Sequence, residues 1–365
     1  MRSVREPSRL QAVRPHLPPE IAAAIERCTR PTLVFERAAL AANMRAVATA
    51  AHASGIRALF AAKSFAHAEV LALAGDLLDG FDVASPGELA AVSGAKIVSI
   101  ADPTGAAIAA ARGARVIVAC ETPEQAAAAP PGAEIAIRIS ASLLGRDPAI
   151  GAVLDGSGRR RSRFGLDDAA QVAYVRAAAG ARAVGLHVHH GPVTAASAER
   201  FVASARAALE LAAFEPAFLD LGGAWHGLDD LAAAFAAVRA AIPASIELLV
   251  EPGRLYARGA GYACGRVHLA RDLGDRELRV VDLSRACHLR WSQPELVGYP
   301  PRPGEGRTVL FAGPTCYEED IVGEWTVDPT HFPPDARIVL REITGYAVGW
   351  NTGFGGVPPA DVVVT

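Results

Sequence analysis

Lys63 closes the apolar run Arg57-Ala-Leu-Phe-Ala-Ala-Lys63, which has the composition of a buried strand. Among small and apolar neighbours a lysine amine loses hydration, and desolvation lowers the pKa of an amine. An amine of lowered pKa is a candidate nucleophile for forming a Schiff base. Most lysines at a strand end only begin a loop. Whether Lys63 has a chemical role therefore depends on which residues stand at the ends of the other apolar runs.

Other polar or conformationally special residues end apolar runs in the same way. They are Asp82, Ser85, Arg138, His187, His189, Gly222, Gly223 and the segment Glu251-Pro-Gly-Arg254. Taken singly each is weak, because a histidine within a Val/Leu strand is more often a hydrogen-bonded core residue. If the runs are parallel strands, however, their carboxyl ends meet on one face, and the residues form one site.

The elements that must position these residues are eight short apolar runs separated by Ala-rich helical stretches. The runs cover residues 57–62, 80–84, 96–100, 115–119, 134–140, 183–189, 217–221 and 246–251. Eight strand-helix repeats predict parallel strands closed into a (β/α)8 barrel. A doubly wound open sheet is the alternative, but no GxGxxG loop follows the first strand.

After Arg254 the pattern changes to short strand-like pieces between turns rich in Pro and Gly. These pieces cover residues 261–268, 277–283, 308–312 and 337–342. The sequence therefore predicts an α/β protein with a TIM-like (β/α)8 barrel over residues 32–254. A second, smaller all-β domain, a β-barrel or β-sandwich, is expected from residues 1–31 together with 255–365, and it carries Cys316.

Composition restricts the partners. The 365 residues are 51% hydrophobic and carry a formal net charge of −3, which offers no basic surface to nucleic acid or to an anionic membrane. The five cysteines are scattered and form no CxxC pair, so neither a disulfide framework nor a metal site is expected. No signal peptide or membrane-spanning run is evident. We therefore expect a cytoplasmic protein whose ligand is a small molecule.

Eight motifs follow one another in an order that is much more specific than any of them alone. They are Phe60-Ala-Ala-Lys63-Ser-Phe65, Gly80-Phe-Asp82-Val-Ala-Ser85-Pro-Gly-Glu88, Ser162-Arg-Phe-Gly165, Gly185-Leu-His187-Val-His189-His190-Gly191-Pro192, Leu219-Asp-Leu-Gly222-Gly223-Ala224, Glu251-Pro-Gly-Arg254, Gly313-Pro-Thr-Cys316, and Gly345-Tyr346 with Phe354-Gly-Gly356. This order resembles the fold-type III pyridoxal-phosphate-dependent decarboxylases, the group of the ornithine, diaminopimelate and carboxynorspermidine enzymes. Three departures are Ser64-Phe65 in place of Ala-Asn, Pro192 in place of Ser, and one glycine fewer after Gly223.

The resemblance implies pyridoxal 5′-phosphate as cofactor and Lys63 as its Schiff-base lysine. Glu251 would face the pyridine nitrogen and keep its proton there. His189 would stack on the ring, with Asp82 and Arg138 also in the cofactor site. The phosphate would be bound by backbone N–H groups of glycines, with an arginine and a tyrosine hydroxyl as further donors. These phosphate residues are Gly222, Gly223, Gly253, Arg254 and Tyr346.

The resemblance also gives Cys316 a catalytic role. After CO2 leaves, Cys316 would deliver a proton to the α-carbon, reaching in from the second subunit of a homodimer with shared active sites. A free cysteine is more often a small buried hydrophobe. Alanine racemases of this fold use a tyrosine instead, so the cysteine motif favours decarboxylation.

The residues expected to determine substrate specificity differ from those of the well-known family members. Tyr317 stands where ornithine- and diaminopimelate-type enzymes have an acid, while Asp320 keeps a later acid of the motif. In the sequence, Arg290 falls close to the position at which diaminopimelate decarboxylases have an arginine that binds a substrate carboxylate. His288 falls close to the position of a histidine common in the carboxynorspermidine enzymes. Since arginine binds carboxylates bidentately, we expect an L-amino acid, free or conjugated, with a distal carboxylate or mixed charge. Polyamine and carboxylate-siderophore biosynthesis both fit.

Two alternatives remain on the same fold. One is an amino acid racemase, which releases no CO2. The other is a catalytically inactive, decarboxylase-like regulator, against which the presence of Lys63, Glu251 and Cys316 counts.

Overall fold

The chain folds into two compact units that are interleaved in sequence. A computed structural model describes residues 10–11, 16–92, 94–141, 153–154, 160–190, 198–223, 225–298 and 306–365. The barrel unit comprises Ala41–Lys63 and Ala68–Tyr256; the β unit comprises Met1–Leu40, Ser64–His67 and Ala257–Thr365. The chain therefore passes between the units at four points, one of them directly after Lys63.

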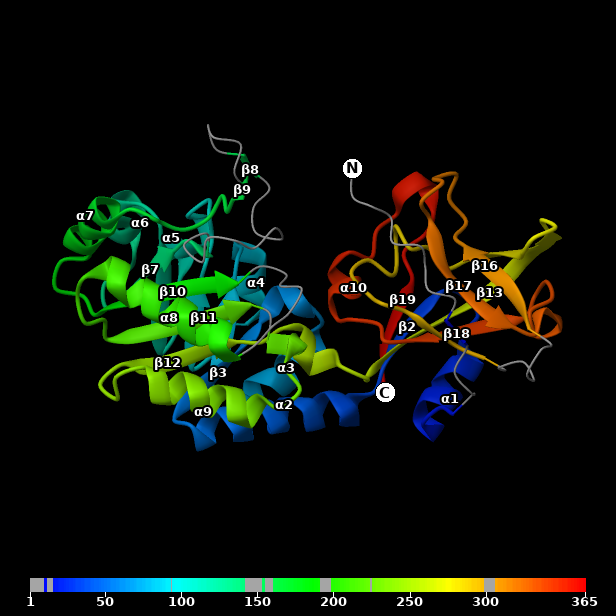
Figure 1. The fold of residues 1–365 in the computed structure, drawn as a ribbon, viewed down its shortest axis with the longest axis horizontal. Helices are drawn as coiled ribbons and strands as arrows, with labels where there is room; N and C mark the ends of the chain where they lie inside the picture. The colour runs from blue at the N-terminus through cyan, green and yellow to red at the C-terminus, as the bar shows by residue number, and fades with distance from the viewer. Residues whose placement is uncertain are drawn as a thin grey trace. The chain divides into compact units, whose positions relative to one another are not determined.

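The barrel unit is a closed barrel of eight parallel strands in the order β10-β11-β12-β3-β4-β5-β6-β7 (Figure 1). The strands are β3 (Ile56–Ala61), β4 (Gly80–Val83), β5 (Ile97–Ile100), β6 (Arg115–Cys120), β7 (Glu134–Ile139), β10 (Val184–His190), β11 (Phe218–Gly223) and β12 (Glu247–Glu251). Each predicted strand is present with its ends shifted by at most two residues. The predicted fold class is confirmed.

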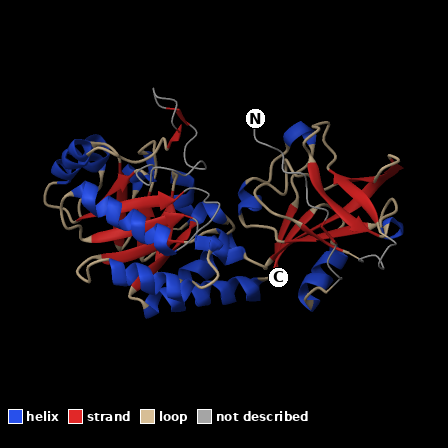
Figure 2. Ribbon diagram, viewed as in Figure 1, coloured by secondary structure: helices blue, strands red, loops and turns tan. Residues whose placement is uncertain are grey.

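Helices alternate with these strands and lie around them, as the blue and red ribbons show (Figure 2). They are α2 (Arg37–Ala53), α3 (Ala68–Leu77), α4 (Pro86–Ala91), α5 (Ala106–Ala110), α6 (Pro123–Ala128), α7 (Ala169–Ala179), α8 (Ala198–Ala212) and α9 (Leu231–Ala241). Their starts follow ordinary capping chemistry. Thr122 and Gln125 form a capping box on α6, and the Ser85 hydroxyl accepts from the Glu88 N–H on α4.

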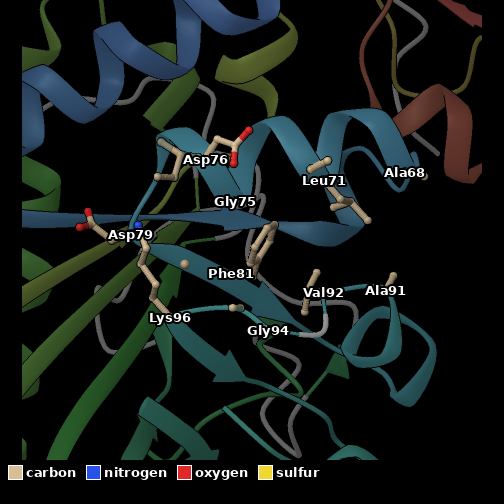
Figure 3. A pocket seen from close by; sticks show the side chains of 14 residues that line it. Ala68, Leu71, Gly75, Asp76, Asp79, Phe81, Ala91, Val92, Gly94 and Lys96 are labelled. Atoms are coloured by element: carbon tan, nitrogen blue, oxygen red, sulfur yellow. The ribbon is translucent and has the colours of Figure 1, made fainter. Parts of the chain in front are cut away.

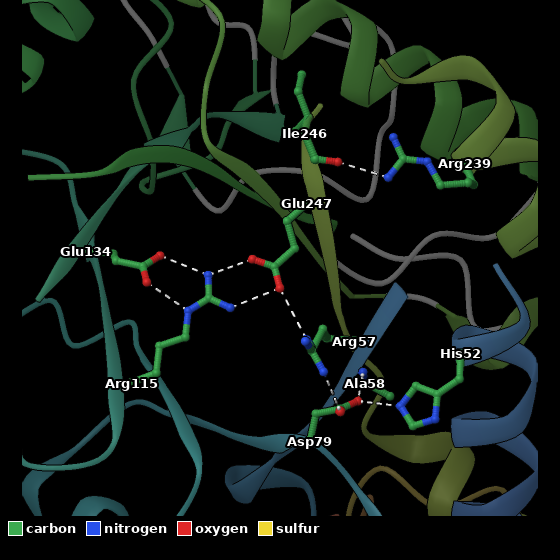
Figure 4. Close-up of polar contacts among 9 residues, drawn as sticks. All are labelled: His52, Arg57, Ala58, Asp79, Arg115, Glu134, Arg239, Ile246 and Glu247. Atoms are coloured by element: carbon green, nitrogen blue, oxygen red, sulfur yellow. Dashed lines mark hydrogen bonds and ion pairs between the residues drawn. The ribbon is translucent and has the colours of Figure 1, made fainter. Parts of the chain in front are cut away.

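Side chains fill the interior of the barrel. Its middle is apolar and contains Leu59, Ile97, Ile117, Ala119, Ala136, Phe218 and Leu249. At the amino ends of the strands, Arg115 bridges Glu134 and Glu247, while Arg57 links Glu247 to Asp79 (Figure 4). Such charges tie strands together at the face of a barrel opposite the catalytic one. The carboxyl ends carry the candidate site.

In the described residues, the β unit contains a nine-stranded sheet and two α-helices. Its strands are β1 (Leu10–Gln11), β2 (Thr32–Phe35), β13 (Gly261–Asp272), β14 (Glu277–Val281), β15 (Glu295–Val297), β16 (Arg307–Ala312), β17 (Ile321–Val327), β18 (Arg337–Arg341) and β19 (Asp361–Val364), and its helices are α1 (Pro19–Arg27) and α10 (Tyr346–Gly349). Helix α1 buries Ile21 and Ile25 against Val34 and Tyr262. A long β13 joins most of the unit, because β14, β18 and β2 all pair with it.

The predicted boundary at residue 32 is wrong. Thr32–Phe35 pairs antiparallel with β13 and parallel with β19, so this strand belongs to the β unit. Ser64–His67 also belongs there, because the Phe65 ring packs on Phe35 with centroids 4.4 Å apart. Both segments are short and apolar, and sequence pattern alone does not reveal which core receives them.

Candidate active site

Lys63 lies in a 3₁₀ turn, Ala62–Ser64, directly after β3. Its Nζ donates to Oδ2 of Asp82 at the end of β4, and the Asp82 side chain is wholly buried. Burial and the charge of Glu251 raise the pKa of Asp82, while Lys63 lowers it. The chain has two lysines; the other, Lys96, is exposed and lies just before the amino end of β5. Lys63 is thus the one lysine at the carboxyl end of the barrel.

Glu251 and two histidines lie beside this pair. His187 Nε2 is 3.5 Å from Glu251 Oε2, and both side chains are 1% exposed. Burial opposes ionisation of Glu251, but the neighbouring His187 and Lys63 hold its pKa below the usual range. Burial, with help from the charge of Lys63, lowers the pKa of His189 to about 3. His189 is therefore neutral at physiological pH, and a neutral imidazole can pack flat against an apolar ring.

Gly222 leaves room for both neighbours. It stands opposite Glu251 in the β11–β12 register, and a Cβ at this position would lie 2.5 Å from Glu251 Oε2 and 2.6 Å from His189 Cδ2. The next residue, Gly223, has φ +96°, a conformation that side chains disfavour. The Asp-Leu-Gly-Gly motif is therefore required for space and backbone angle at the rim of the site.

Arg138, at the end of β7, is held by the Ser162-Arg-Phe-Gly165 motif. Its guanidinium lies 4.4 Å from the centre of the Phe164 ring, and its carbonyl accepts from Leu166 N–H at 2.8 Å. Gly165 has φ +82°, and a Cβ there would meet the backbone of Ser140. A motif recognised in sequence as a family signature thus positions an arginine.

The Glu251-Pro-Gly-Arg254 motif continues into a 3₁₀ turn, Arg254–Ala257. Tyr256 anchors this turn, because its hydroxyl donates to the Leu59 carbonyl at 3.1 Å and its ring stacks on Phe60 at 5.1 Å. The turn that begins at Arg254 is therefore anchored on β3, the strand that precedes Lys63. Tyr346, the remaining predicted phosphate ligand, begins α10 and belongs to the β unit.

Asp320, predicted to contact substrate, is buried within the β unit as a hydrogen-bond centre. Its Oδ1 accepts from the N–H groups of Arg285 (2.6 Å) and Ala286 (3.2 Å), and its Oδ2 accepts from the Thr315 hydroxyl (2.7 Å). The Ser284 hydroxyl lies 3.0 Å from both oxygens. These donors occupy both oxygens, so the prediction of substrate contact is corrected: Asp320 joins the segment after β14 to the segment that carries Cys316.

His288, also predicted to contact substrate, is likewise enclosed. Its Nδ1 accepts from Ser284 N–H at 3.1 Å, and its Nε2 lies 3.0 Å from the Pro358 carbonyl, to which it donates. Both ring nitrogens are thus occupied in the neutral form, and the side chain is fully buried. His288 has a structural role, which corrects the substrate prediction.

The predicted residues Cys316, Tyr317 and Arg290 are exposed instead. Tyr317 is 48% exposed and Trp291, Trp350 and Phe354 are 45%, 40% and 56% exposed, an unusual amount of aromatic surface. The Arg290 guanidinium lies 4.6 Å from the centre of a Trp350 ring. Trp291 contacts both Tyr346 and Trp350, and Tyr317 contacts Phe354. We call the exposed residues Cys316, Tyr317, Arg290, Trp291, Trp350 and Phe354 the Cys316 surface. Exposed apolar patches mark binding surfaces.

Two buried polar residues in the barrel had no predicted role. Asp220, within the Asp-Leu-Gly-Gly motif, is wholly buried, and Ser99 in β5 donates to its Oδ2 at 3.2 Å. A polar residue at an inward position of an otherwise apolar strand was the available signal.

The structure also shows Glu121 3.5 Å from Arg138. His190 side-chain placement, Gly191, Pro192 and Ala224 lie outside the described residues.

A separate hollow lies on the outer side of the barrel unit (Figure 3). It is lined by small residues of α3, such as Ala72 and Gly75, and by Phe81 and Lys96. It contains none of the groups around Lys63. Within the described residues no cluster of three or more His, Cys, Asp or Glu could hold a metal, and no helix is long and apolar enough to cross a membrane.

Residues 37–258, well over half of the chain, match the family model of the pyridoxal-binding domain of pyridoxal-dependent decarboxylases. The chain belongs to this family. The predicted family, enzyme class and cofactor are thereby confirmed: the protein is a pyridoxal-phosphate-dependent decarboxylase. No protein with a curated description matches it in sequence.

Solved structures show the same fold over the whole decarboxylase. The arginine decarboxylase of Paramecium bursaria Chlorella virus has a TM-score of 0.75 at 17% identity, over 95% of this chain and 98% of that chain. The lysine/ornithine decarboxylase of Vibrio vulnificus, complexed with putrescine, has 0.77 at 17%, over 96% and 99%. The lysine decarboxylase of Selenomonas ruminantium has 0.72 at 19%, over 96% and 97%.

The site of the decarboxylase fits pyridoxal phosphate. Several buried polar atoms at the carboxyl end of the barrel have no hydrogen-bond partner among the described residues: Asp82 Oδ1, both Glu251 carboxylate oxygens and both His187 ring nitrogens. Native proteins rarely bury so many polar atoms without partners. A ring that carries a nitrogen and polar substituents would supply those partners.

Proposed function

We propose that this decarboxylase acts on an L-amino acid, free or conjugated, whose distal end carries a carboxylate. Pyridoxal phosphate, when bound, withdraws electrons from the α-carbon of an amino acid. The rest of the proposal concerns what the residues of this chain do. The observation that carries it is Arg290, exposed on the Cys316 surface and stacked on Trp350.

Cofactor binding is proposed for the barrel residues. The Lys63 amine, which Asp82 orients, would form the bond to the aldehyde of the cofactor. Arg138 would also lie in the cofactor site. Glu251 would face the ring nitrogen, and His189 would pack on the ring. The phosphate would be held by backbone N–H groups and two side chains, namely Gly222, Gly223, Gly253, Arg254 and Tyr346. Support comes from the Lys63–Asp82 pair and from the unpartnered Glu251 oxygens.

Cys316 is proposed to hold the proton that the α-carbon receives, acting from the partner subunit of a homodimer. Two observations support this. Cys316 is exposed, whereas Cys120 and Cys264 are buried and have pKa values raised to about 12 by burial. Cys316 also lies in an aromatic surface that a second subunit could cover.

The distal group of the substrate is proposed to meet Arg290. Among the described residues, no carboxylate forms an ion pair with Arg290, and its guanidinium lies over the face of a Trp350 ring, 4.6 Å from the ring centre. Two acids nearby already accept hydrogen bonds. Both oxygens of Asp320 accept them within the β unit, and Glu319 accepts one from the Tyr317 hydroxyl at 2.7 Å. A planar cation held in this way suits a carboxylate better than an ammonium group.

The cellular setting is proposed on chemical grounds. All five cysteines are free, which supports a reducing compartment such as the cytoplasm. A carboxylate-bearing amino acid or amino-acid conjugate would place the enzyme in polyamine or carboxylate-siderophore biosynthesis.

The test is a CO2-release assay of the purified enzyme. One set of L-amino acids carries a distal carboxylate, and a matched set carries a distal ammonium group. We expect turnover of the first set, and Arg290→Gln should lower kcat/KM by about 10- to 100-fold because a charged hydrogen bond is lost. Arg271→Gln, at an exposed arginine of β13, is the control. Faster turnover of the ammonium set, unaffected by Arg290→Gln, would contradict the proposal.

A further inference from the structure

The barrel interior contains more negative than positive side chains. Asp82, Asp220 and Glu251 are exposed by 0%, 0% and 3%. Lys63, whose side chain is 32% exposed, pairs with Asp82. Arg138 pairs with Glu121 and also interacts electrostatically with Glu251 and Asp82. Burial penalises the charged form of each of these three carboxylates, and their charges repel one another. Protonation of one of them relieves both costs.

The contacts single out Asp220. Its Oδ2 accepts from the Ser99 hydroxyl at 3.2 Å, while its Oδ1 has no hydrogen-bond partner among the described residues. Asp220 and Glu251 lie on neighbouring strands: Gly222, two residues after Asp220 on β11, stands opposite Glu251 on β12. The two oxygens of Glu251 also lack hydrogen-bond partners among the described residues. A proton on Oδ1 would satisfy Asp220 and one oxygen of Glu251 together.

The surrounding charges favour the proton on Asp220 rather than on Glu251. Glu251 lies 3.5 Å from His187 Nε2 and interacts electrostatically with Lys63. Asp220 instead faces two carboxylates, Glu251 and Asp82. Burial, followed by these two charges, raises the pKa of Asp220 well above its ordinary value.

We propose that Asp220 is a positioning residue that stays protonated and donates a hydrogen bond to Glu251 from the interior of the barrel, with Ser99 fixing its orientation. This rests on the proposed role of Glu251 at the ring nitrogen. A carboxylate that already accepts a hydrogen bond is a weaker base. The proton between Glu251 and the ring nitrogen therefore lies on the nitrogen, where electron withdrawal requires it.

The first test uses the protein without cofactor and does not depend on the proposed function. Infrared difference spectra at neutral pH should show the carbonyl stretch of a protonated buried carboxylic acid. This band should be lost in Asp220→Asn and kept in Asp229→Asn, at an exposed position of the neighbouring loop. Absence of the band in the unmodified protein, or its persistence in Asp220→Asn, would overturn the proposal.

The second test measures pyridoxal phosphate affinity and the pH dependence of the visible absorption of the bound cofactor. Asp220→Asn keeps an N–H donor, so its affinity should remain within about threefold; Asp220→Leu removes the donor and should weaken binding about 10- to 100-fold. Equal affinities of the two variants would refute the role at Glu251. If Asp220→Leu does not fold, the infrared result and Asp220→Asn still decide. If Asp220 is protonated but the role of Glu251 is wrong, the unmodified protein still shows the infrared band, while Asp220→Asn and Asp220→Leu bind pyridoxal phosphate with equal affinity.

Discussion

Gly222 and Glu251 face each other across β11 and β12, and the Glu251 carboxylate occupies the space that a side chain at position 222 would need. His189 closes the same space from the other side. The geometry of the proposed ring-nitrogen ligand thus depends on the absence of a neighbouring Cβ. A glycine in a strand usually weakens it, so its presence here indicates a requirement of the site.

Gly222→Ala should therefore displace Glu251 and His189. We expect a loss of pyridoxal phosphate affinity of at least about tenfold, and a lower free energy of unfolding by about 1–3 kcal/mol from overpacking. Absorption titration and urea unfolding measure the two effects. Gly349→Ala is the matched control, because nothing lies within 4 Å of a Cβ at that position. An unchanged affinity in Gly222→Ala would show that Glu251 need not be held in place.

The small number of lysines makes the attachment site simple to identify. Borohydride reduction followed by peptide mass analysis should place the cofactor on Lys63 and not on Lys96, the other lysine of the chain. Lys63→Ala should abolish the adduct and the visible absorption band, while Lys96→Ala should keep both. An adduct that survives in Lys63→Ala would exclude Lys63 as the attachment point.

Shared active sites can be tested by mixing two inactive variants. Lys63→Ala and Cys316→Ala, refolded or co-expressed together, should recover about a quarter of the unmodified activity, because half of the dimers are mixed and each holds one intact site. Either variant alone should remain nearly inactive. No recovery from a mixture shown to contain mixed dimers would place both residues of a site in one subunit.

His288 should make the β unit sensitive to acid. Burial lowers its pKa, and protonation of Nδ1 would break the bond from Ser284 N–H. Below the unfolded value of about 6.5, the unfolded chain binds a proton that the folded chain does not, so stability falls as pH falls. Urea unfolding at about pH 7.5 and about pH 5.5 should show a smaller loss in His288→Gln than in the unmodified protein. His16→Gln, at an exposed residue, should leave the loss unchanged; equal losses in all three would contradict the prediction.

Arg115 should contribute stability and not catalysis. It joins β6 to β7 and β12 through bonds of 2.7–3.0 Å to Glu134 and Glu247 (Figure 4). Arg115→Gln should lower the free energy of unfolding by about 2–3 kcal/mol, as expected for lost bonds between charged groups. The kcat of the folded variant should stay near that of the unmodified enzyme. Arg206→Gln, on the exposed face of α8, serves as control; a loss of kcat at full stability would mean that the network also shapes the active site.

The barrel could be predicted from sequence because its strands are buried on both sides and read as continuous apolar runs. β6, with the sequence Arg-Val-Ile-Val-Ala-Cys, is such a run after its first residue. β17 was missed, because only one of its faces is buried and Gly323 and Glu324 interrupt the pattern. β2 was assigned to the wrong unit, since its partners β13 and β19 are more than 200 and 300 residues away in the chain.

The site could be predicted only as far as motifs mark residue types at strand ends. The motif that contains Asp320 does not reveal whether its acid binds a ligand or a backbone, and the same holds for His288. Those answers depend on the donors of Arg285, Thr315 and Ser284, which only the folded β unit brings together. Asp220 lies within a motif that the sequence reveals, yet its proposed role depends on Ser99 and Glu251 from two other strands.

The interleaving of the two units has a consequence for how this enzyme can change over evolutionary time. Neither unit is a single stretch of chain, and Ser64–His67 enters the β unit between Lys63 and the next helix of the barrel. A single recombination event cannot exchange one unit for that of a relative without separating Phe65 from Phe35. If the Cys316 surface binds substrate as proposed, new substrate preferences should therefore arise through point substitutions on it rather than through exchange of whole modules.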